Sequence, residues 1–279
     1  MNASRILSQV AAWAASDANV RRVLLVGSRA RTINPDDFAD VDLQVYVTTT
    51  ARYAEDIGWL STIDEVWLCV RDAYVDGELN VPTCLVIFAG GAKVDFAFYP
   101  AGVLSDGVRR GRACRVVIDK EPTTPLEAIS PVAVAQPDAP TEAAFRRAID
   151  EFWFEAYHVA MYLARRELWL AKSRDWAAKQ FLLSMIEWHE RFVRGRAVDP
   201  DSAGRRAAMS HETWQALDAA FGGLAREESW AALLAMTALF RRLAREAAAA
   251  LAFPYPEDLD RSLSGLISAV RDLPGGHDR

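Results

Sequence analysis

Apolar residues in the first 120 positions alternate between helical spacing and strand spacing. Ile6, Val10 and Trp13 recur at helical spacing and predict a helix over Ala3–Ala15. A short helix is expected over Arg52–Trp59, among runs that predict strands. These strands are expected over Val20–Val26, Val41–Val47, Glu65–Val70, Thr83–Phe88, Ala92–Tyr99 and Cys114–Ile118. The pattern predicts a mixed sheet with helices packed against it.

The pattern changes after residue 120. Prolines at 122, 125, 131, 137 and 140 predict an extended connection, because proline blocks helix and removes a backbone donor. Helical spacing then continues from a plausible N-cap at Thr141. The expected helices cover Glu142–Leu170, Ala177–Phe192, Glu212–Phe221, Ser229–Leu251 and Pro256–Arg271. We therefore predict an α+β protein with a sheet domain over 1–120, a linker over 121–140 and a helical bundle over 141–279.

Two acidic side chains stand at the head of the strand expected over Val41–Val47. Asp40 and Asp42 lie two residues apart, so on a strand they point to the same face. Holding two carboxylates together costs repulsion and desolvation, and a bound cation is the usual reason for it. Upstream, Gly27 and Ser28 end an apolar run in a turn whose backbone N–H groups suit phosphate. Together these features indicate a site for a Mg²⁺-bound triphosphate.

This arrangement resembles the nucleotidyltransferase superfamily related to DNA polymerase β, which adds a third carboxylate on a nearby strand. The candidate here is Asp95, since Val94 and Phe96 on either side of it alternate to the opposite face. The resemblance implies that Asp40, Asp42 and Asp95 hold Mg²⁺ and carry the catalysis. The alternative is a strand–turn–strand whose acids are surface residues without a ligand.

The similarity extends over nearly the whole chain. The stretch GSRARTINPDDFADVDL, from Gly27 to Leu43, is similar to the aminoglycoside 6-adenylyltransferases, which modify streptomycin. Other similar stretches are RVVIDK at Arg115–Lys120, PTEAAF and EFWFEAYHVA within Pro140–Ala160, KQFLLSMIEWH at Lys179–His189 and SAVRDLP at Ser268–Pro274. The family's segments between Asp72 and Pro82 and between Arg194 and Ser210 are not recognisable here, so the acceptor is less well defined than the chemistry.

The resemblance implies transfer of AMP from ATP to an aminoglycoside hydroxyl, with streptomycin the expected acceptor and pyrophosphate the by-product. Asp95 is either a ligand of a second metal ion or the base that accepts the hydroxyl proton. The expected nucleotide contacts are Gly27, Ser28, Arg29 and Lys179. Arg29 is either a phosphate ligand or a solvated turn residue, and Lys179 is either a triphosphate ligand or a surface lysine.

A polycationic acceptor requires carboxylates and flat aromatic walls. The helical domain offers Glu151, Trp153, Glu155 and Asp175 as the expected acceptor contacts. Glu151 and Glu155 lie four residues apart and so share a helical face. The alternative is that the tryptophans belong to the core and that the acids pair with Arg146, Arg147 or Arg165.

Charge and composition narrow the classes of partner. A net charge of −6 argues against a nucleic acid and favours a small or cationic acceptor. Three cysteines without metal-ligand spacing indicate a reducing cytoplasm. The apolar stretch Trp230–Phe253 is interrupted by Arg241, Arg242 and Arg245, so it predicts an amphipathic helix and not a membrane span. We expect a cytoplasmic monomer.

Two other functions agree with the same residues. The chain could transfer a nucleotide to a different small molecule or to a protein side chain. It could also be a nucleotide-binding sensor without catalysis, although three costly carboxylates would then have no use.

Overall fold

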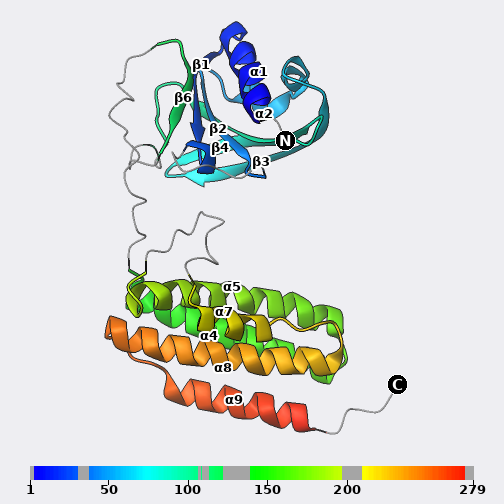
Figure 1. Ribbon diagram of the computed structural model, residues 1–279, viewed down its shortest axis with the longest axis vertical. Coiled ribbons are helices and arrows are strands. Elements are labelled where there is room, and N and C mark those ends of the chain that lie inside the picture. The colour runs from blue at the N-terminus through cyan, green and yellow to red at the C-terminus, as the bar shows by residue number, and fades with distance from the viewer. Residues whose placement is uncertain are drawn as a thin grey trace. The chain divides into compact units, whose positions relative to one another are not determined.

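The computed structural model describes residues 3–30, 38–105, 108, 113–121, 139–196 and 209–273. It divides the chain into two compact units, Met1–Ala135 and Gln136–Arg279 (Figure 1). Most of the expected linker over 121–140 lies outside the described residues, as does Asp37 in the segment before Asp40. Each unit has its own hydrophobic core, so each is described by itself.

The first unit is a six-stranded mixed sheet with strand order β3-β4-β5-β2-β1-β6. Its strands are β1 Val20–Val26, β2 Val41–Val47, β3 Val66–Asp76, β4 Leu79–Phe88, β5 Lys93–Pro100 and β6 Arg115–Asp119. β2 and β5 pair in parallel, whereas the other neighbouring strands are antiparallel. The mixed sheet that the hydrophobic pattern predicted is therefore confirmed.

The two faces of this sheet differ. One face is covered by α1 (Ala3–Ser16), α2 (Ala51–Glu55) and the 3-10 turn η2 (Gly58–Thr62), as Figure 1 shows for the two helices. Apolar side chains from alternate positions of β1, β2 and β5 pack against these helices, and Val94 and Phe96 are completely buried there. Asp95, which lies between Val94 and Phe96 on β5, must therefore point to the other face of the sheet.

The strand expected over Glu65–Val70 is longer than predicted. β3 runs to Asp76 and turns directly into β4, so the segment between Asp72 and Pro82 is largely paired strand. Gly77 closes the hairpin with a φ of 63°, which suits the first central position of a two-residue turn. Pro82 is tolerated in β4 because the pairing of β4 with β5 begins only at Thr83.

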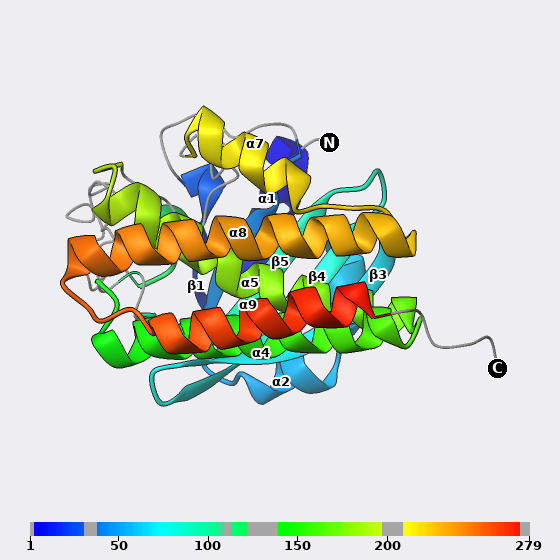
Figure 2. The same ribbon diagram turned by 90° about the horizontal axis from the view of Figure 1, so that it is seen from below.

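The second unit is helical, with α4 (Glu142–Ala164), α5 (Leu168–Phe192), α7 (His211–Ala219), α8 (Arg226–Leu251) and α9 (Glu257–Asp272). Figure 2 shows α4, α8 and α9 running side by side. Their core includes a close stack of Phe152 on Phe240, with ring centroids 3.6 Å apart. Thr141 caps α4 as expected, because its side chain accepts a hydrogen bond from the Ala144 N–H.

The prediction of a single helix over Glu142–Leu170 is wrong. The chain leaves the helix at Arg165 and re-enters it at Leu168, with Arg166 in the left-handed region at φ 60°. Reversed hydrogen bonds from the N–H groups of Arg166 and Glu167 to Leu163 and Tyr162 carbonyls close this turn. No glycine or proline marks this break in the sequence. Because the second helix begins directly after it, α5 starts at Leu168 and not at the expected Ala177.

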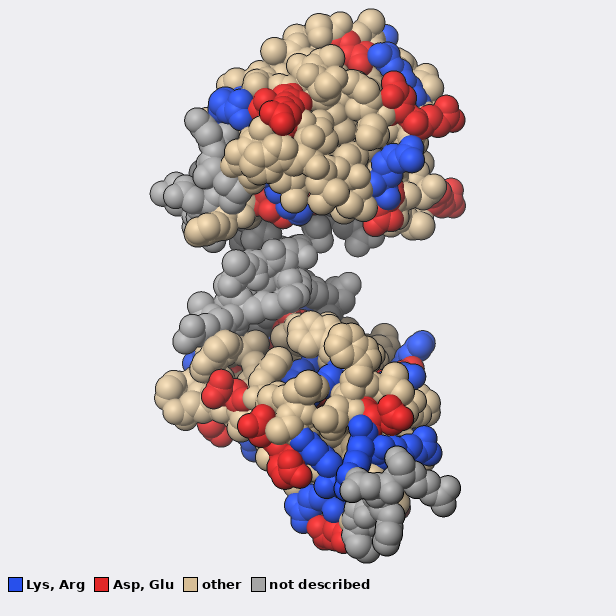
Figure 3. All heavy atoms as spheres, turned by 90° about the vertical axis from the view of Figure 1, so that its right-hand side faces the viewer, with Lys and Arg blue, Asp and Glu red and all other residues tan. Residues whose placement is uncertain are grey.

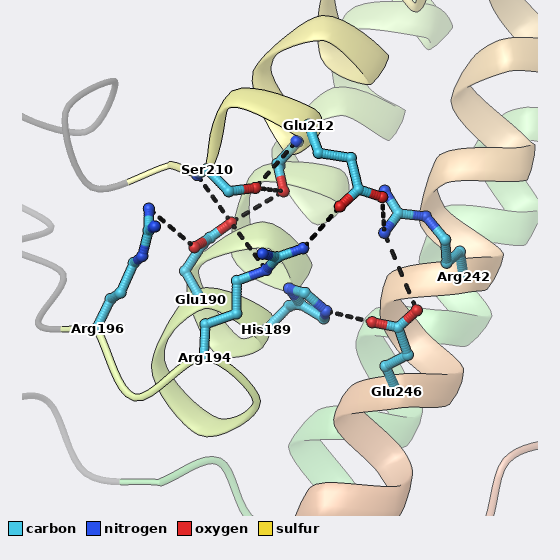
Figure 4. A network of polar contacts seen from close by, with 9 residues as sticks. His189, Glu190, Arg194, Arg196, Ser210, Glu212, Arg242 and Glu246 are labelled. Carbon is cyan, nitrogen blue, oxygen red and sulfur yellow. Dashed lines mark hydrogen bonds and ion pairs between the residues drawn. The ribbon is translucent and has the colours of Figure 1, made fainter.

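A buried polar cluster joins α5, α7 and α8 (Figure 4). Glu190 is 1% exposed and accepts hydrogen bonds from the Ser210 N–H at 3.1 Å and the Thr213 hydroxyl at 2.9 Å. Ser210 is in turn the N-cap of α7. His189, the residue before Glu190 in α5, has its Nε2 2.6 Å from Glu246 Oε2 on α8. The cluster fixes the start of α7 against the end of α5.

Acidic and basic side chains are interspersed over the face of the first unit shown in Figure 3. This mixed surface agrees with the modest net charge of −6. Among the helices that the structure describes, none is both long and apolar enough to cross a membrane.

Candidate active site

The parallel pairing of β2 and β5 places two of the three expected acids side by side. Asp42 is paired in register with Asp95, and the apolar neighbours Val41 and Val94 pair on the buried face. Residues paired on adjacent strands point to the same face, so both carboxylates lie on the face of the sheet opposite α1 and α2. A long connection separates them in the chain, and the sheet brings them together.

Asp40 lies just before β2 and reaches the same cluster through a lysine. Lys93 Nζ lies 2.5 Å from Asp40 Oδ2 and 3.1 Å from Asp95 Oδ2, so its ammonium bridges the two carboxylates. Sequence reasoning did not single out Lys93. The signal was present, because Lys93 precedes Asp95 by two residues on one strand and so shares its face.

The carboxyl group of Asp42 has a raised pKa. Burial is the main cause that raises its pKa from 3.8 to about 6, and repulsion from Asp95 and Asp40 adds to it. The charges of Lys93 and Arg29 oppose the rise without cancelling it. The fold therefore concentrates negative charge at this point and leaves it incompletely neutralised.

Gly27 packs its backbone directly on this carboxylate. Its φ is 69°, and a Cβ at this position would lie 2.1 Å from Asp42 Oδ2. Any other residue would therefore displace the Asp42 side chain. Ser28 follows in a 3-10 turn, η1 (Ser28–Ala30), beside the acids. Ser28 is exposed, whereas Arg29 and Ala30 are partly buried.

Arg29 has a definite structural position. Its guanidinium donates hydrogen bonds to the Ala39 carbonyl at 2.9 and 2.7 Å and to the Asp40 carbonyl at 3.1 Å. These bonds tie the turn after β1 to the residues that lead into β2. Arg29 therefore holds the backbone of Asp40 in place, a role that the sequence did not reveal.

The donor set fits a hard divalent cation. Carboxylate oxygens are the ligands that Mg²⁺ prefers, and Asp95 Oδ1 is buried with no hydrogen-bond partner among the described residues. The described residues do not contain three acidic, histidine or cysteine side chains gathered as a metal-binding group, and Asp40 is bound to Lys93. Asp42 and Asp95 are thus the two acids that strand pairing alone places side by side.

In the second unit, two residues expected to bind different substrates bind each other. The ammonium of Lys179 forms an ion pair with Asp175 one helical turn earlier and lies 4.7 Å from the centre of the Phe221 ring. Lys179 is only 6% exposed, and burial lowers its pKa. It is therefore not the surface lysine that one interpretation of the sequence suggested.

The expected acceptor residues on α4 occupy different environments. Trp153 is fully buried in the core of the second unit. Glu155 is 8% exposed and lies 3.2 Å from Arg174. Glu151 remains partly exposed and pairs with Arg147 at 3.7 Å. The structure thus does not place these three side chains on one open surface.

Comparison with known proteins identifies relatives along most of the chain. The aminoglycoside 6-adenylyltransferase of Bacillus subtilis (strain 168) is 25% identical over 273 residues, which cover 93% of this chain and 95% of the relative. The enzyme of that name from Campylobacter jejuni is 25% identical and covers 88% of this chain and 87% of its own. The one from Staphylococcus aureus is 28% identical, with 68% and 70% covered.

Two solved structures are also similar. The crystal structure of an aminoglycoside 6-adenyltransferase from Bacillus subtilis has a TM-score of 0.47 at 20% identity and covers 96% of this chain and 97% of its own. A nucleotidyltransferase-like protein from Exiguobacterium sibiricum 255-15 has a TM-score of 0.34 at 12% identity, with 89% and 76% covered. The assignment of a family depends on the sequence match.

That match is extensive. The sequence model of the family described as streptomycin adenylyltransferase covers residues 1–270. The chain therefore belongs to the streptomycin adenylyltransferase family, a family of nucleotidyltransferase enzymes.

Proposed function

We propose that this protein transfers AMP from ATP to a hydroxyl of an aminoglycoside, with streptomycin as the expected acceptor. The observation that carries the proposal is the in-register pair of Asp42 and Asp95 beside the Gly27 turn. The family match and the names of the relatives give the reaction type and the class of acceptor. The reaction forms a bond between the acceptor oxygen and the α-phosphorus and breaks the bond to pyrophosphate.

In this proposal, Asp42 and Asp95 would hold Mg²⁺ together with Asp40. The cation would supply charge neutralisation for the triphosphate and for the pyrophosphate that leaves. The buried, unpartnered Asp95 Oδ1 supports this role, and a bound cation would offset the burial and the carboxylate repulsion that raise the pKa of Asp42.

The acceptor hydroxyl must lose its proton as it attacks phosphorus. Asp95 is the candidate to accept this proton in place of binding the cation, since its one unpartnered oxygen among the described residues can serve only one of these roles. Asp42 is the poorer candidate, because Gly27 packs against its Oδ2.

The nucleotide contacts divide into two groups. Gly27 would let the backbone approach the triphosphate, and the exposed Ser28 would donate its hydroxyl or N–H. Arg29 would act chiefly by holding Asp40, since its guanidinium is bonded to the carbonyls of residues 39 and 40. Lys179 would have to exchange Asp175 for phosphate.

For the acceptor, the proposal retains the exposed or exchangeable acids. Glu151 is partly exposed, and Asp175 becomes available when Lys179 moves to phosphate. A polycationic acceptor would then replace the arginine and lysine partners of these acids. Glu155 would have to leave Arg174, and the buried Trp153 would support the helix from the core and not touch the acceptor. We propose that the enzyme acts as a cytoplasmic monomer without nucleic acid.

The experiment combines a substrate panel with an active-site variant. Purified protein is incubated with labelled ATP, Mg²⁺ and a set of aminoglycosides, and both labelled product and pyrophosphate are measured. We expect streptomycin to be labelled, with Asp42→Asn lowering turnover at least a hundredfold. Labelling of a non-aminoglycoside acceptor would change the substrate class, whereas ATP binding without any turnover would identify a sensor.

A further inference from the structure

Lys93 is the unexpected member of the acid cluster. At the starts of β2 and β5, the ammonium of Lys93 lies within 3.1 Å of the carboxylates of Asp40 and Asp95, and Asp42 is paired in register with Asp95. Lys93 is also the first residue of β5, so the strand carries both the cation and one of its partners. A lysine in this position neutralises charge that would otherwise repel across the cluster.

The contacts of Lys93 are of the kind that a divalent cation can replace. The side chains of Lys93, Asp40 and Asp95 are 38%, 42% and 27% exposed, so both ion pairs are partly solvated. Ion pairs of this kind contribute little to stability, because water screens the charges and the long lysine side chain loses freedom in forming them. Lysine also has a long, flexible side chain and a single point charge, which lets the ammonium move away at small cost.

The same contacts occupy oxygens that a divalent cation needs. Asp40 Oδ2 and Asp95 Oδ2 both bind the ammonium, whereas Asp95 Oδ1 is buried and has no hydrogen-bond partner within the part of the chain that the structure describes. An ammonium and a divalent cation would compete for this position, because each requires the same carboxylate lone pairs.

We propose that Lys93 is the resident counter-ion of the acid cluster, which holds Asp40 and Asp95 together in the free enzyme and is displaced when a divalent cation binds. Lys93 is thus a positioning residue for the site. This inference rests on the proposed function, since the cation belongs to that function.

The test measures metal binding directly. Mn²⁺ replaces Mg²⁺ as the probe, and its affinity for the full-length protein without nucleotide is measured by electron paramagnetic resonance. Lys93→Met removes the competing charge at similar length, and we expect Mn²⁺ to bind roughly tenfold more tightly, as the loss of two weak ion pairs would give. Lys93→Arg keeps the charge and should leave the affinity near that of the wild type.

A matched control removes a positive charge elsewhere in the same unit. Arg21 lies at the opposite end of β1 from the site and pairs with Glu121 at 3.6 Å. Arg21→Met changes the net charge by the same amount and should leave Mn²⁺ binding unchanged.

A second readout is thermal unfolding with chelator and with Mn²⁺. Without metal, Lys93→Met should melt below the wild type, because the carboxylates repel, and Mn²⁺ should raise its melting temperature more than that of the wild type. If Lys93→Met is poorly folded, Lys93→Gln provides the same comparison with a smaller polar group.

Unchanged or weaker Mn²⁺ binding by Lys93→Met would overturn the inference, because it would show that Lys93 does not compete with the cation for the carboxylates. Absence of Mn²⁺ binding by the wild type would overturn it as well. If the wild type binds Mn²⁺ and the variant binds it more tightly, but no aminoglycoside is labelled, the proposed function fails while the role of Lys93 stands.

Discussion

Two features of Asp42 both disfavour the ionised form of its carboxyl group. It is largely buried, and it stands beside two other carboxyl groups, which together raise its pKa from 3.8 to about 6. A raised carboxyl pKa means that the folded state binds a proton more readily than the unfolded chain does. The ionised form of Asp42 therefore lowers the stability of the fold at neutral pH.

Asp42→Asn should separate stability from activity. Between about pH 4 and 6 the stability of the metal-free wild type falls as pH rises, and above 6 the cost is complete. The variant avoids this cost, so it should be more stable by about 1–2 kcal/mol at pH 7.5 once solvent screening is allowed for. Urea unfolding at pH 7.5 and pH 4 measures the difference, which should disappear at the lower pH.

Turnover of the same variant should be lost at every pH. A variant that is less stable than the wild type at pH 7.5 would show that Asp42 is already neutralised in the free protein.

Gly27→Ala should damage the site more than the fold. The added methyl group would meet Asp42 Oδ2 and force the carboxylate to move, and displacements of this size cost about a hundredfold in rate. The left-handed φ adds about 1–2 kcal/mol of strain. Initial rates and unfolding curves together test this expectation.

Gly90→Ala is the matched control, because Gly90 has a φ of 81° and nothing within 4 Å of an added Cβ. It should lower stability by a similar amount and leave the rate unchanged. An equal loss of rate in both variants would point to backbone strain and not to the contact with Asp42.

The sequence predicted the residues of this site better than their contacts. The two-residue spacing of Asp40 and Asp42 and the alternation around Asp95 are local patterns, and the parallel register of β2 and β5 agrees with them. Which carboxylates pair, and with which cation, depends on long-range pairing. For that reason the hydrogen bonds of Arg29 and the bridge formed by Lys93 became visible only in the structure.

At the level of elements, a single buried carboxylate joins two helices. Glu190 at the end of α5 accepts hydrogen bonds from the N-cap residue of α7, Ser210, and from Thr213 (Figure 4). Arg194 and Arg196 lie 3.9 and 3.7 Å from it and supply the opposite charge. α7 is short, so its position depends on this contact and on its packing against α8.

Glu190→Ala should therefore destabilise the second unit strongly. Removal of the carboxylate leaves the Ser210 N–H and two arginines without their buried partner, at a cost of about 3 kcal/mol. Glu212→Ala is the control, since Glu212 is exposed and its pairs with Arg194 and Arg242 lie at the surface. That variant should lose less than about 1 kcal/mol.

Urea unfolding followed by circular dichroism at 222 nm measures both variants. Similar losses in the two proteins would assign the effect to the general charge of this region and not to burial of Glu190.

The elements themselves were predicted where periodicity was strong. All six strands lie near the expected positions, and the bounds of β1 and β2 match the prediction. The turn at Arg166 was missed because it contains neither glycine nor proline. The predicted strand at β3 ended too early because the apolar residues Ala73–Val75 are consecutive and exposed, without the alternation that marks a half-buried strand. In both places tertiary context overrides the local signal.

On the scale of the whole molecule, the two units have separate hydrophobic cores. The first core lies between the sheet and α1, and the second lies among α4, α5 and α8. Separate cores predict separate unfolding transitions.

Calorimetry of the full chain tests this independence. Glu190→Ala should lower the melting temperature of one transition, and Asp42→Asn should raise that of the other. In the double variant the two shifts should add, because Asp42 belongs to the first unit and Glu190 to the second. A single transition that moves with both substitutions would show that the units unfold together.

The hairpin of β3 and β4 has a further consequence. It lies in the chain between β2 and β5 but at the outer edge of the sheet, beyond β5. The acids on β2 and β5 are aligned by their own pairing, so the tip at Gly77 can lengthen or shorten without altering their separation. Changes of length or sequence in this hairpin are thus compatible with an unchanged pairing of the two acids.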